Sequence, residues 1–192
     1  MKLLTRSRCP LSVPEKKITK VLFCKIAHMK YYKGIEEYND TPFSTDSYVI
    51  ETGHCGEEYN FKTFENDNGE EICTGFVEHG GRQLRIENIE SYNKKHDITD
   101  NDVLVVWFSR PKRNSRFRIY GWYNNAAVYR YHDEDYCYFS AKAEDCTLLP
   151  EDARADWEIP KNFILFRENH VKYVNIPELE SYAKEITKRI EN

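Results

Sequence analysis

The stretch from Val103 to Arg130, VLVVWFSRPKRNSRFRIYGWYNNAAVYR, is the feature that most limits what this chain can fold into. Its first part, Val103–Phe108, is a nearly unbroken apolar run, which is typical of a strand buried on both faces. We therefore expect it to form the centre of a sheet. The abundance of aromatic residues, with 14 Tyr, 10 Phe and 3 Trp, also favours strands over a helical bundle.

Two more strands are expected after the basic loop that follows this run, over residues 117–123 and 126–130. Asn124 and Asn125 separate them, and asparagine tolerates the left-handed conformation that a tight hairpin requires. The sequence therefore predicts a hairpin turn at these two asparagines.

The N-terminal part of the chain predicts a strand and then a short helix. Residues 18–26, ITKVLFCKI, are dense in β-branched and apolar residues, which indicates a strand. Over residues 27–35 a helical turn would place Met29 and Tyr32 on one side, and Gly34 would stop it.

The middle of the chain predicts a long loop and a hairpin. Residues 36–57 are expected to run over one end of the sheet, and loops of this length are often functional. Residues 58–64 and 72–77 alternate large and polar side chains around a turn, which indicates a hairpin. Residues 82–89 could form a strand or a short helix, and residues 91–102 are expected to be loop.

Towards the C-terminus we expect short strands at 137–141 and 147–149, and a polar stretch over 150–160 anchored by Trp157. Apolar residues at helical spacing, together with Pro177, predict a helix over 177–190.

The expected fold is α+β and mostly β: a β-barrel with flanking short helices and a C-terminal helix, with a β-sandwich as the alternative. We expect a flexible N-terminal arm over residues 1–17 and a barrel domain over residues 18–160. A C-terminal extension over 161–192 would contain the helix at 177–190.

The net charge of −4 does not by itself suggest nucleic-acid binding, but the positive charge is unevenly distributed. A basic loop concentrates five cations that could contact phosphates: Arg110, Lys112, Arg113, Arg116 and Arg118. A solvated loop with no partner is the alternative.

The six cysteines show no CxxC pair and no regular spacing, and the chain starts without a secretory hydrophobic region. No run of eighteen apolar residues is present, so no membrane span or membrane partner is expected. We expect a cytoplasmic protein with reduced cysteines.

No complete catalytic motif is present. His132 and Glu134 match the H-x-E of zinc nucleotide deaminases, but the P-C-x-x-C pair that would supply the other ligands is missing. The carboxylates form no convincing arrangement for a metal-dependent nuclease. His54 and Cys55 are adjacent, so their side chains would point apart in a strand and would not form a nucleophile and its base. We expect no catalytic residue, no metal and no cofactor.

A crowd of aromatic residues beside the basic loop suggests a pocket for a nucleic-acid base, because every base offers a π face for stacking. Asparagine amides would read the edge of that base. The candidate pocket residues from this reasoning are Tyr31, Tyr32, Tyr59, Asn60, Trp107, Trp122, Asn124 and Asn125.

Five blocks of the sequence carry a resemblance to a known group of domains. They are FCKIAHMKYYKG (23–34), EEYNF (57–61), VLVVWFSR (103–110), GWYNNAAVYR (121–130) and DCTLLPEDAR (145–154). The chain resembles a group of bacterial domains found at the N-terminus of nuclease-like proteins, and that group is similar to the EVE and YTH-like domains of the PUA superfamily. His28 departs from the group, which tends to have tryptophan there, and the resemblance implies that this residue also belongs to the base pocket.

The resemblance implies a compact β-barrel that recognises a modified base flipped into an aromatic pocket. We therefore expect a non-enzymatic reader of nucleic acid, with DNA that carries a modified base as its partner. A role in phage defence together with a separate nuclease is a further expectation. An RNA-binding PUA-like module is the first alternative. A protein-interaction or regulatory module with no nucleic-acid ligand is the second.

Overall fold

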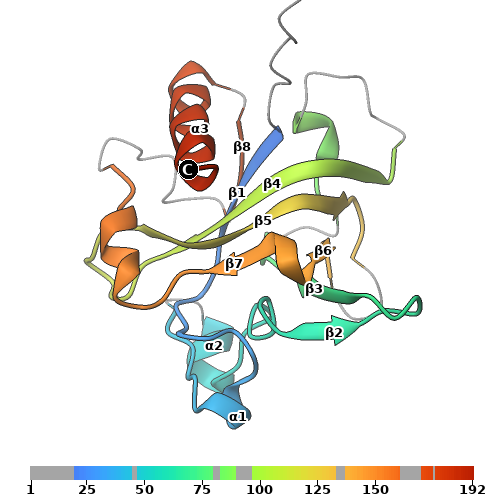
Figure 1. Ribbon diagram of the computed structural model, residues 1–192. Helices are drawn as coiled ribbons and strands as arrows, with labels where there is room; N and C mark the ends of the chain where they lie inside the picture. Colours follow the sequence, from blue (N-terminus) through green and yellow to red (C-terminus); the bar gives the residue numbers. More distant parts are fainter. Residues whose placement is uncertain are drawn as a thin grey trace, which may run out of the picture.

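The computed structural model describes residues 20–44, 47–79, 83–89, 97–132, 137–160, 170–174 and 176–192 (Figure 1). The expected arm over 1–17 and the H-x-E glutamate at 134 lie outside the described residues. The strands are β1 (Lys20–Lys25), β2 (Thr63–Glu65), β3 (Glu71–Gly75), β4 (Thr99–Ser109), β5 (Arg118–Tyr129), β6 (Phe139–Lys142), β7 (Cys146–Leu148) and β8 (Val171–Tyr173). The helices are α1 (Ile35–Tyr38), α2 (Ser47–Thr52) and α3 (Pro177–Ile190), with 3-10 turns at Ile86–Asn88, Ala143–Asp145 and Ala153–Trp157.

The apolar run predicted as the sheet centre does lie there. Strand β4 pairs in parallel with β1 on one side and antiparallel with β5 on the other. Every residue of β4 from Val103 to Ser109 is buried. A strand with neighbours on both sides and packed layers on both faces needs such an uninterrupted apolar sequence.

The sheet is mixed and open. Its order is β2-β3-β6-β5-β4-β1-β8, and β7 pairs with β5 beside that path. Among the described residues β2 and β8 do not pair, so the chain is α+β and mostly β as predicted, but closure into a barrel is not confirmed.

The predicted hairpin at Asn124 and Asn125 is wrong, because β5 continues through both residues as one strand. Val103 pairs with Ala126 and Val105 pairs with Tyr123, so two asparagines oppose a single residue of β4. This two-against-one arrangement is a β-bulge. Asn125 has a φ of 50°, so the left-handed tendency of asparagine is used, but in a bulge.

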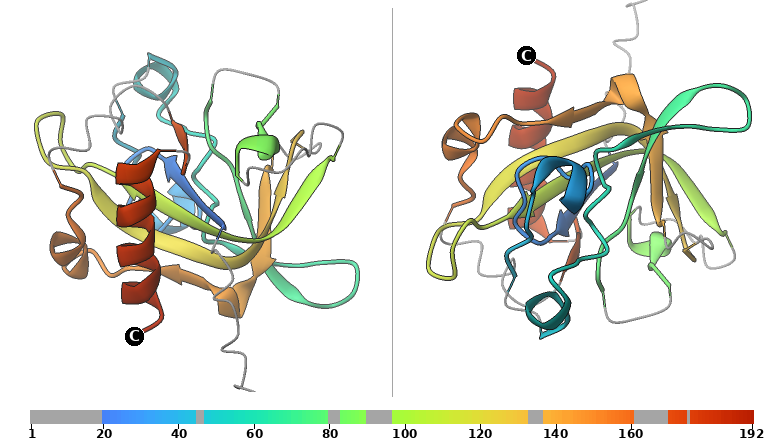
Figure 2. Two further views of the ribbon diagram at one scale, coloured as in Figure 1. Left: turned by 90° about the horizontal axis from the view of Figure 1, so that it is seen from above. Right: turned by 90° about the horizontal axis from the view of Figure 1, so that it is seen from below.

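The sheet separates two apolar cores, and successive side chains of a strand point alternately into one and the other. Val21 and Phe23 of β1 face α3, whereas Leu22 and Cys24 face the other side. The helix predicted over 177–190 is confirmed, and it lies across one face of the sheet (Figure 2). Its buried apolar stripe consists of Leu179, Tyr182, Ala183 and Ile186. Helices α1 and α2 lie on the opposite side of the sheet (Figures 1 and 2). None of the described helices combines the length and apolar content that crossing a membrane requires.

The helical turn predicted over 27–35 is also wrong. The carboxylate of Asp40 accepts hydrogen bonds from the backbone N–H groups of Lys30, Tyr31 and Tyr32, at 2.6 to 2.9 Å. Tyr32 has a φ of 52°, which a helix does not allow. The chain therefore forms an irregular loop around a buried carboxylate, and a helix begins only at Ile35.

The remaining predictions are partly confirmed. Strands β2 and β3 form the expected hairpin, but residues 58–61 are turns rather than strand. The long segment 36–57 contains α1 and α2, so it is not structureless. Residues 86–88 form a 3-10 turn, and the expected loop over 91–102 gives way to β4 from Thr99.

Candidate functional site

The two tryptophans predicted for the base pocket lie on opposite faces of the sheet, in closed cores. Trp107 is 0% exposed and contacts Tyr123 and Phe139 edge to face, with ring centroids 5.2 Å apart in each case. Trp122 is 8% exposed and packs against Trp157 on the side that α3 covers. Their side chains therefore belong to the scaffold and cannot meet in one pocket.

Tyr32 and Asn60 are also buried, and their polar groups are satisfied inside the protein. The hydroxyl of Tyr32 donates to the carbonyl of Ala27 at 2.6 Å. The amide of Asn60 accepts from the N–H of Phe76 and donates to the carbonyl of Phe76, both at 2.9 Å. Asn60 thus fixes the backbone of another aromatic residue instead of reading a base.

His28 and Tyr31 lie near the surface. The Nδ1 atom of His28 is 2.5 Å from the hydroxyl of Tyr120, and burial together with Arg154 lowers the pKa of this histidine. The ring of Tyr31 is exposed and contacts Tyr38. In the bulge of β5, Asn124 is half-buried and exposed Asn125 donates to Asp145 at 3.3 Å.

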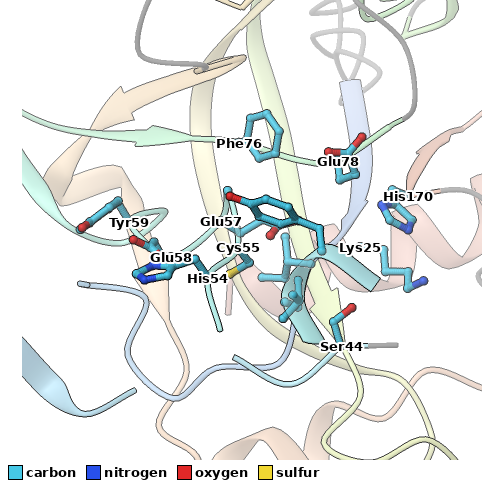
Figure 3. Close-up of a pocket in the computed structure, with 15 residues that line it drawn as sticks. Lys25, Ser44, His54, Cys55, Glu57, Glu58, Tyr59, Phe76, Glu78 and His170 are labelled. Atoms are coloured by element: carbon cyan, nitrogen blue, oxygen red, sulfur yellow. Dashed lines mark hydrogen bonds and ion pairs between the residues drawn. The ribbon is translucent and has the colours of Figure 1, made fainter. Parts of the chain in front are cut away.

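A cavity of about 830 Å³ lies where β1 ends, and Tyr59 is the one predicted pocket residue that lines it. Its walls come from the segment after β1, from α2, from the loop 54–59, from the segment after β3 and from the residue before β8 (Figure 3). The aromatic side chains of the lining are Tyr48, Tyr59 and Phe76.

Three local features of the sequence shape the walls of this cavity. The hydroxyl of Ser109, the last residue of β4, donates to the carbonyl of Ile26 at 2.7 Å, which fixes the chain just beyond β1. Val49 anchors α2 in the core, so its neighbour Tyr48 is left exposed at the cavity. A Cβ on Gly56 would lie 2.4 Å from the ring of Phe76, so only glycine lets that ring approach the loop.

Two buried glutamates give the cavity an acidic interior. Glu57 is 5% exposed, and burial raises its pKa to about 7, opposed by contacts with the backbone of Glu57 and Glu78. Glu58 is 7% exposed, and its Oε2 lies 3.0 Å from Nδ1 of His54. These carboxyl groups can accept hydrogen bonds from a ligand, and Glu57 can hold a proton near neutral pH.

Cys55 lines the same cavity but is not activated. Burial raises the pKa of its thiol, with Glu57 adding to the shift, and its sulfur faces the sulfur of Met29 at 3.5 Å. A thiol reacts as its thiolate, so a raised pKa makes it inert. His54 pairs with Glu58, and the described residues contain no cluster of ligands that could hold a metal.

The basic loop divides into a paired part and an exposed part. Arg116 and Arg118 both bind Glu158, at 2.8 and 3.2 Å. Lys112 and Arg113 are exposed, whereas Arg110 is half-buried against the ring of Phe117, 5.3 Å from its centroid. The loop leaves β4 at Ser109, whose hydroxyl binds Ile26 of the cavity wall. The loop and the cavity are therefore at the same end of the parallel pair β1 and β4.

Sequence reasoning missed the carboxylates and two of the three aromatic walls, Tyr48 and Phe76. The long excursion over 36–57 is one signal that points to this region, because long loops in compact domains are often functional. The block EEYNF at 57–61 also contains Glu57 and Glu58 beside Tyr59.

Comparison with known proteins finds no counterpart: no family model, curated protein or solved structure matches the chain.

Proposed function

We propose that this protein is a non-enzymatic reader of nucleic acid that accepts one extruded, modified base of DNA in the cavity beside α2. The observation that carries the proposal is the position of an aromatic-walled cavity, large enough to hold a base, at the same sheet end as an exposed basic loop. Ligand cavities of about 300 to 1,000 Å³ are typical of small-molecule sites, so a base with a substituent would fit.

The aromatic lining suits a flat, unpaired ring. Tyr48 is 60% exposed, so its ring is accessible to a ligand. Tyr59 is 44% exposed and has Lys62 over its ring, 5.4 Å from the centroid, while Asn60 holds Phe76 in place. Extrusion of a base costs a few kcal/mol, and stacking contributes about 1 to 3 kcal/mol per base. Two or three aromatic contacts would therefore offset the cost of flipping.

The exposed cations of the loop are suited to holding the DNA backbone. Lys112 and Arg113 would contact phosphates, with Arg110 closest to the cavity end of the loop. Such contacts provide affinity without sequence preference. Arg116 and Arg118 are engaged by Glu158, so we assign them to the loop's own structure.

Membership of the PUA superfamily forms part of the proposal. It is supported by a strongly curved mixed sheet whose first strand pairs in parallel with the central strand, and by flanking helices on both faces (Figure 1). In this interpretation the sheet is an incompletely closed barrel and the cavity lies at its open end.

The test is fluorescence anisotropy with labelled DNA duplexes that differ at one base: unmodified, 5-methylcytosine, N6-methyladenine or 8-oxoguanine. We expect one modified duplex to bind at least about tenfold tighter than plain DNA, because a lost stack costs about 1 to 3 kcal/mol. Tyr48→Ala and Phe76→Ala should remove this preference. Equal or absent binding of all duplexes would overturn the proposal.

Arg113→Glu should weaken binding to every duplex alike and reduce the salt dependence of the affinity. Lys184→Glu, on the exposed side of α3, is the matched control and should leave binding unchanged. Structured RNA that outcompetes DNA would favour the RNA-binding alternative. Retained affinity in Arg113→Glu would remove the loop from the interface and favour a protein-docking role for it.

A further inference from the structure

The buried charged side chains of the cavity lining are carboxylates, which accept hydrogen bonds. Glu57, Glu58 and Glu78 all line the cavity, and the first two are more than nine-tenths buried. A carboxylate held away from water is stable only where it accepts hydrogen bonds or meets positive charge. An occupant that supplies donors would therefore be favoured over one that supplies acceptors.

Glu57 and Glu58 differ in the kind of group that contacts their carboxylates. Glu58 contacts His54 on the same loop, at 3.0 Å. The contacts that stabilise the charged form of Glu57 come from the backbone of Glu57 and Glu78 and from Cys55. No lysine or arginine is among these groups. Figure 3 shows Glu57 on the same loop as Cys55, among the residues that line the cavity. Glu57 is thus a buried acceptor of the cavity lining whose stabilising contacts include no cationic side chain.

We infer that the base bound in this cavity presents two adjacent N–H donors to Glu57, the pattern found on the Watson–Crick edge of guanine. This inference rests on the proposed function, and it names the class of base that the proposed cavity selects. The modification would then lie away from that edge, on the imidazole side of the purine.

The chemistry of the other bases explains the selectivity. Guanine offers N1–H and the exocyclic amino group side by side, and a carboxylate has two oxygens that accept both in parallel, as it does from arginine. Adenine and cytosine place a ring nitrogen that is itself an acceptor beside their amino group. Thymine flanks its single N–H with two carbonyl oxygens. Each of these three bases would set a lone pair against a carboxylate oxygen.

The preference depends on the ionisation of Glu57, which titrates near neutral pH. The other ionisable groups that line the cavity are His54, Cys55, Glu58 and Tyr59 of the same loop, Tyr48 of α2, Glu78 after β3, Lys25 at the end of β1, and His170 before β8. The ionised carboxylate accepts two donors, whereas the protonated carboxyl also donates and can pair with any base. Selectivity for guanine should therefore rise as the pH rises from 6 to 8.

The experiment uses labelled duplexes in which one plain base lies opposite an abasic site, so that each base is equally free to leave the stack. Affinities for guanine, adenine, cytosine and thymine are measured at pH 6 and pH 8. A bidentate contact is worth about 1 to 3 kcal/mol, so we expect guanine to bind roughly tenfold tighter than the others at pH 8. The advantage should shrink at pH 6.

Glu57→Gln separates recognition from packing, because glutamine keeps the shape but offers one acceptor and one donor. That pattern matches adenine or cytosine, so the variant should lose the preference for guanine and gain affinity for one of those bases. Glu185→Gln, exposed on α3, is the control and should bind as the wild type does.

The outcomes of these experiments test the preference for guanine separately from the proposed reader function. Equal affinity for all four bases, or a guanine preference that Glu57→Gln leaves intact, would overturn the inference while the reader function stands. Binding that Tyr48→Ala and Phe76→Ala leave unchanged, or no binding at all, would overturn both.

Discussion

Asn60 holds both backbone groups of Phe76: its amide oxygen accepts from the N–H of Phe76 and its amide nitrogen donates to the carbonyl, each at 2.9 Å. Asn60 is 1% exposed, so these bonds are shielded from water. The pair joins the turn before β2 to the segment after β3. Through it, a buried residue of one loop positions an aromatic wall of the cavity on another.

Asn60→Ala should lower the free energy of unfolding by about 3 kcal/mol, because two hydrogen bonds disappear and two backbone groups lose their partners. The measurement is urea denaturation followed by tyrosine and tryptophan fluorescence. Asn68→Ala is the matched control, because the side chain of Asn68 is exposed in the turn between β2 and β3. An equal and small effect of both substitutions would show that the clamp on Phe76 contributes little.

Gly56→Ala should displace the ring of Phe76, since the added Cβ would lie 2.4 Å from two of its carbons. Overpacking of this kind costs about 1 to 3 kcal/mol of stability. We also expect weaker binding of the DNA ligand, measured by anisotropy. Because both substitutions act on one contact, Phe76→Ala should weaken binding much less in the Gly56→Ala background than in the wild type. Additive losses would contradict this coupling.

The sequence predicted the centre of the sheet and the C-terminal helix because their patterns are long. The apolar side chains of Val103–Phe108 are all buried only if both faces of the strand are covered, and the apolar residues of α3 recur over several helical turns. The asparagine pair was misplaced for a different reason. The left-handed conformation of Asn125 serves a hairpin turn and a β-bulge equally well, and only the pairing of β4 with β5 distinguishes them.

The candidate site was harder to predict because tertiary contacts assemble it. Trp107 and Trp122 are close in sequence on paired strands, yet the register places Trp122 opposite Val106, so the two rings point to opposite faces. The cavity draws on segments as distant as Lys25 and His170. The raised pKa of Glu57 results from its burial, which no local pattern of the sequence specifies.

Cys55 should resist alkylation in the folded protein. Burial raises the pKa of its thiol, so the thiolate population at pH 8 is very small. Iodoacetamide labelling followed by peptide mass spectrometry should modify half-buried Cys137 first and Cys55 only when urea unfolds the chain. Rapid native labelling of Cys55 would show that the thiol is activated, and it would revive a nucleophilic role for the pair with His54.

Glu57 should make the protein less stable as the pH rises. Its pKa in the folded state is about 7, above the ordinary value of 4.5, so between these values the folded chain holds a proton that the unfolded chain has released. Stability is therefore greatest below pH 4.5 as far as this group is concerned, falls as the pH rises towards 7, and levels off above it.

Glu57→Gln removes this titration. From pH 5 to pH 8, the free energy of unfolding of the variant relative to the wild type should increase by about 2 to 3 kcal/mol, since each unit of pKa shift corresponds to about 1.4 kcal/mol. Urea denaturation at the two pH values measures the difference. The control Glu185→Gln, at an exposed position of α3, should show the same change in the free energy of unfolding as the wild type. If Glu57→Gln also shows the same change as the wild type, the carboxyl group of Glu57 ionises as easily as one in water. The proposed change of Glu57 from protonated to ionised between pH 6 and pH 8 is then wrong.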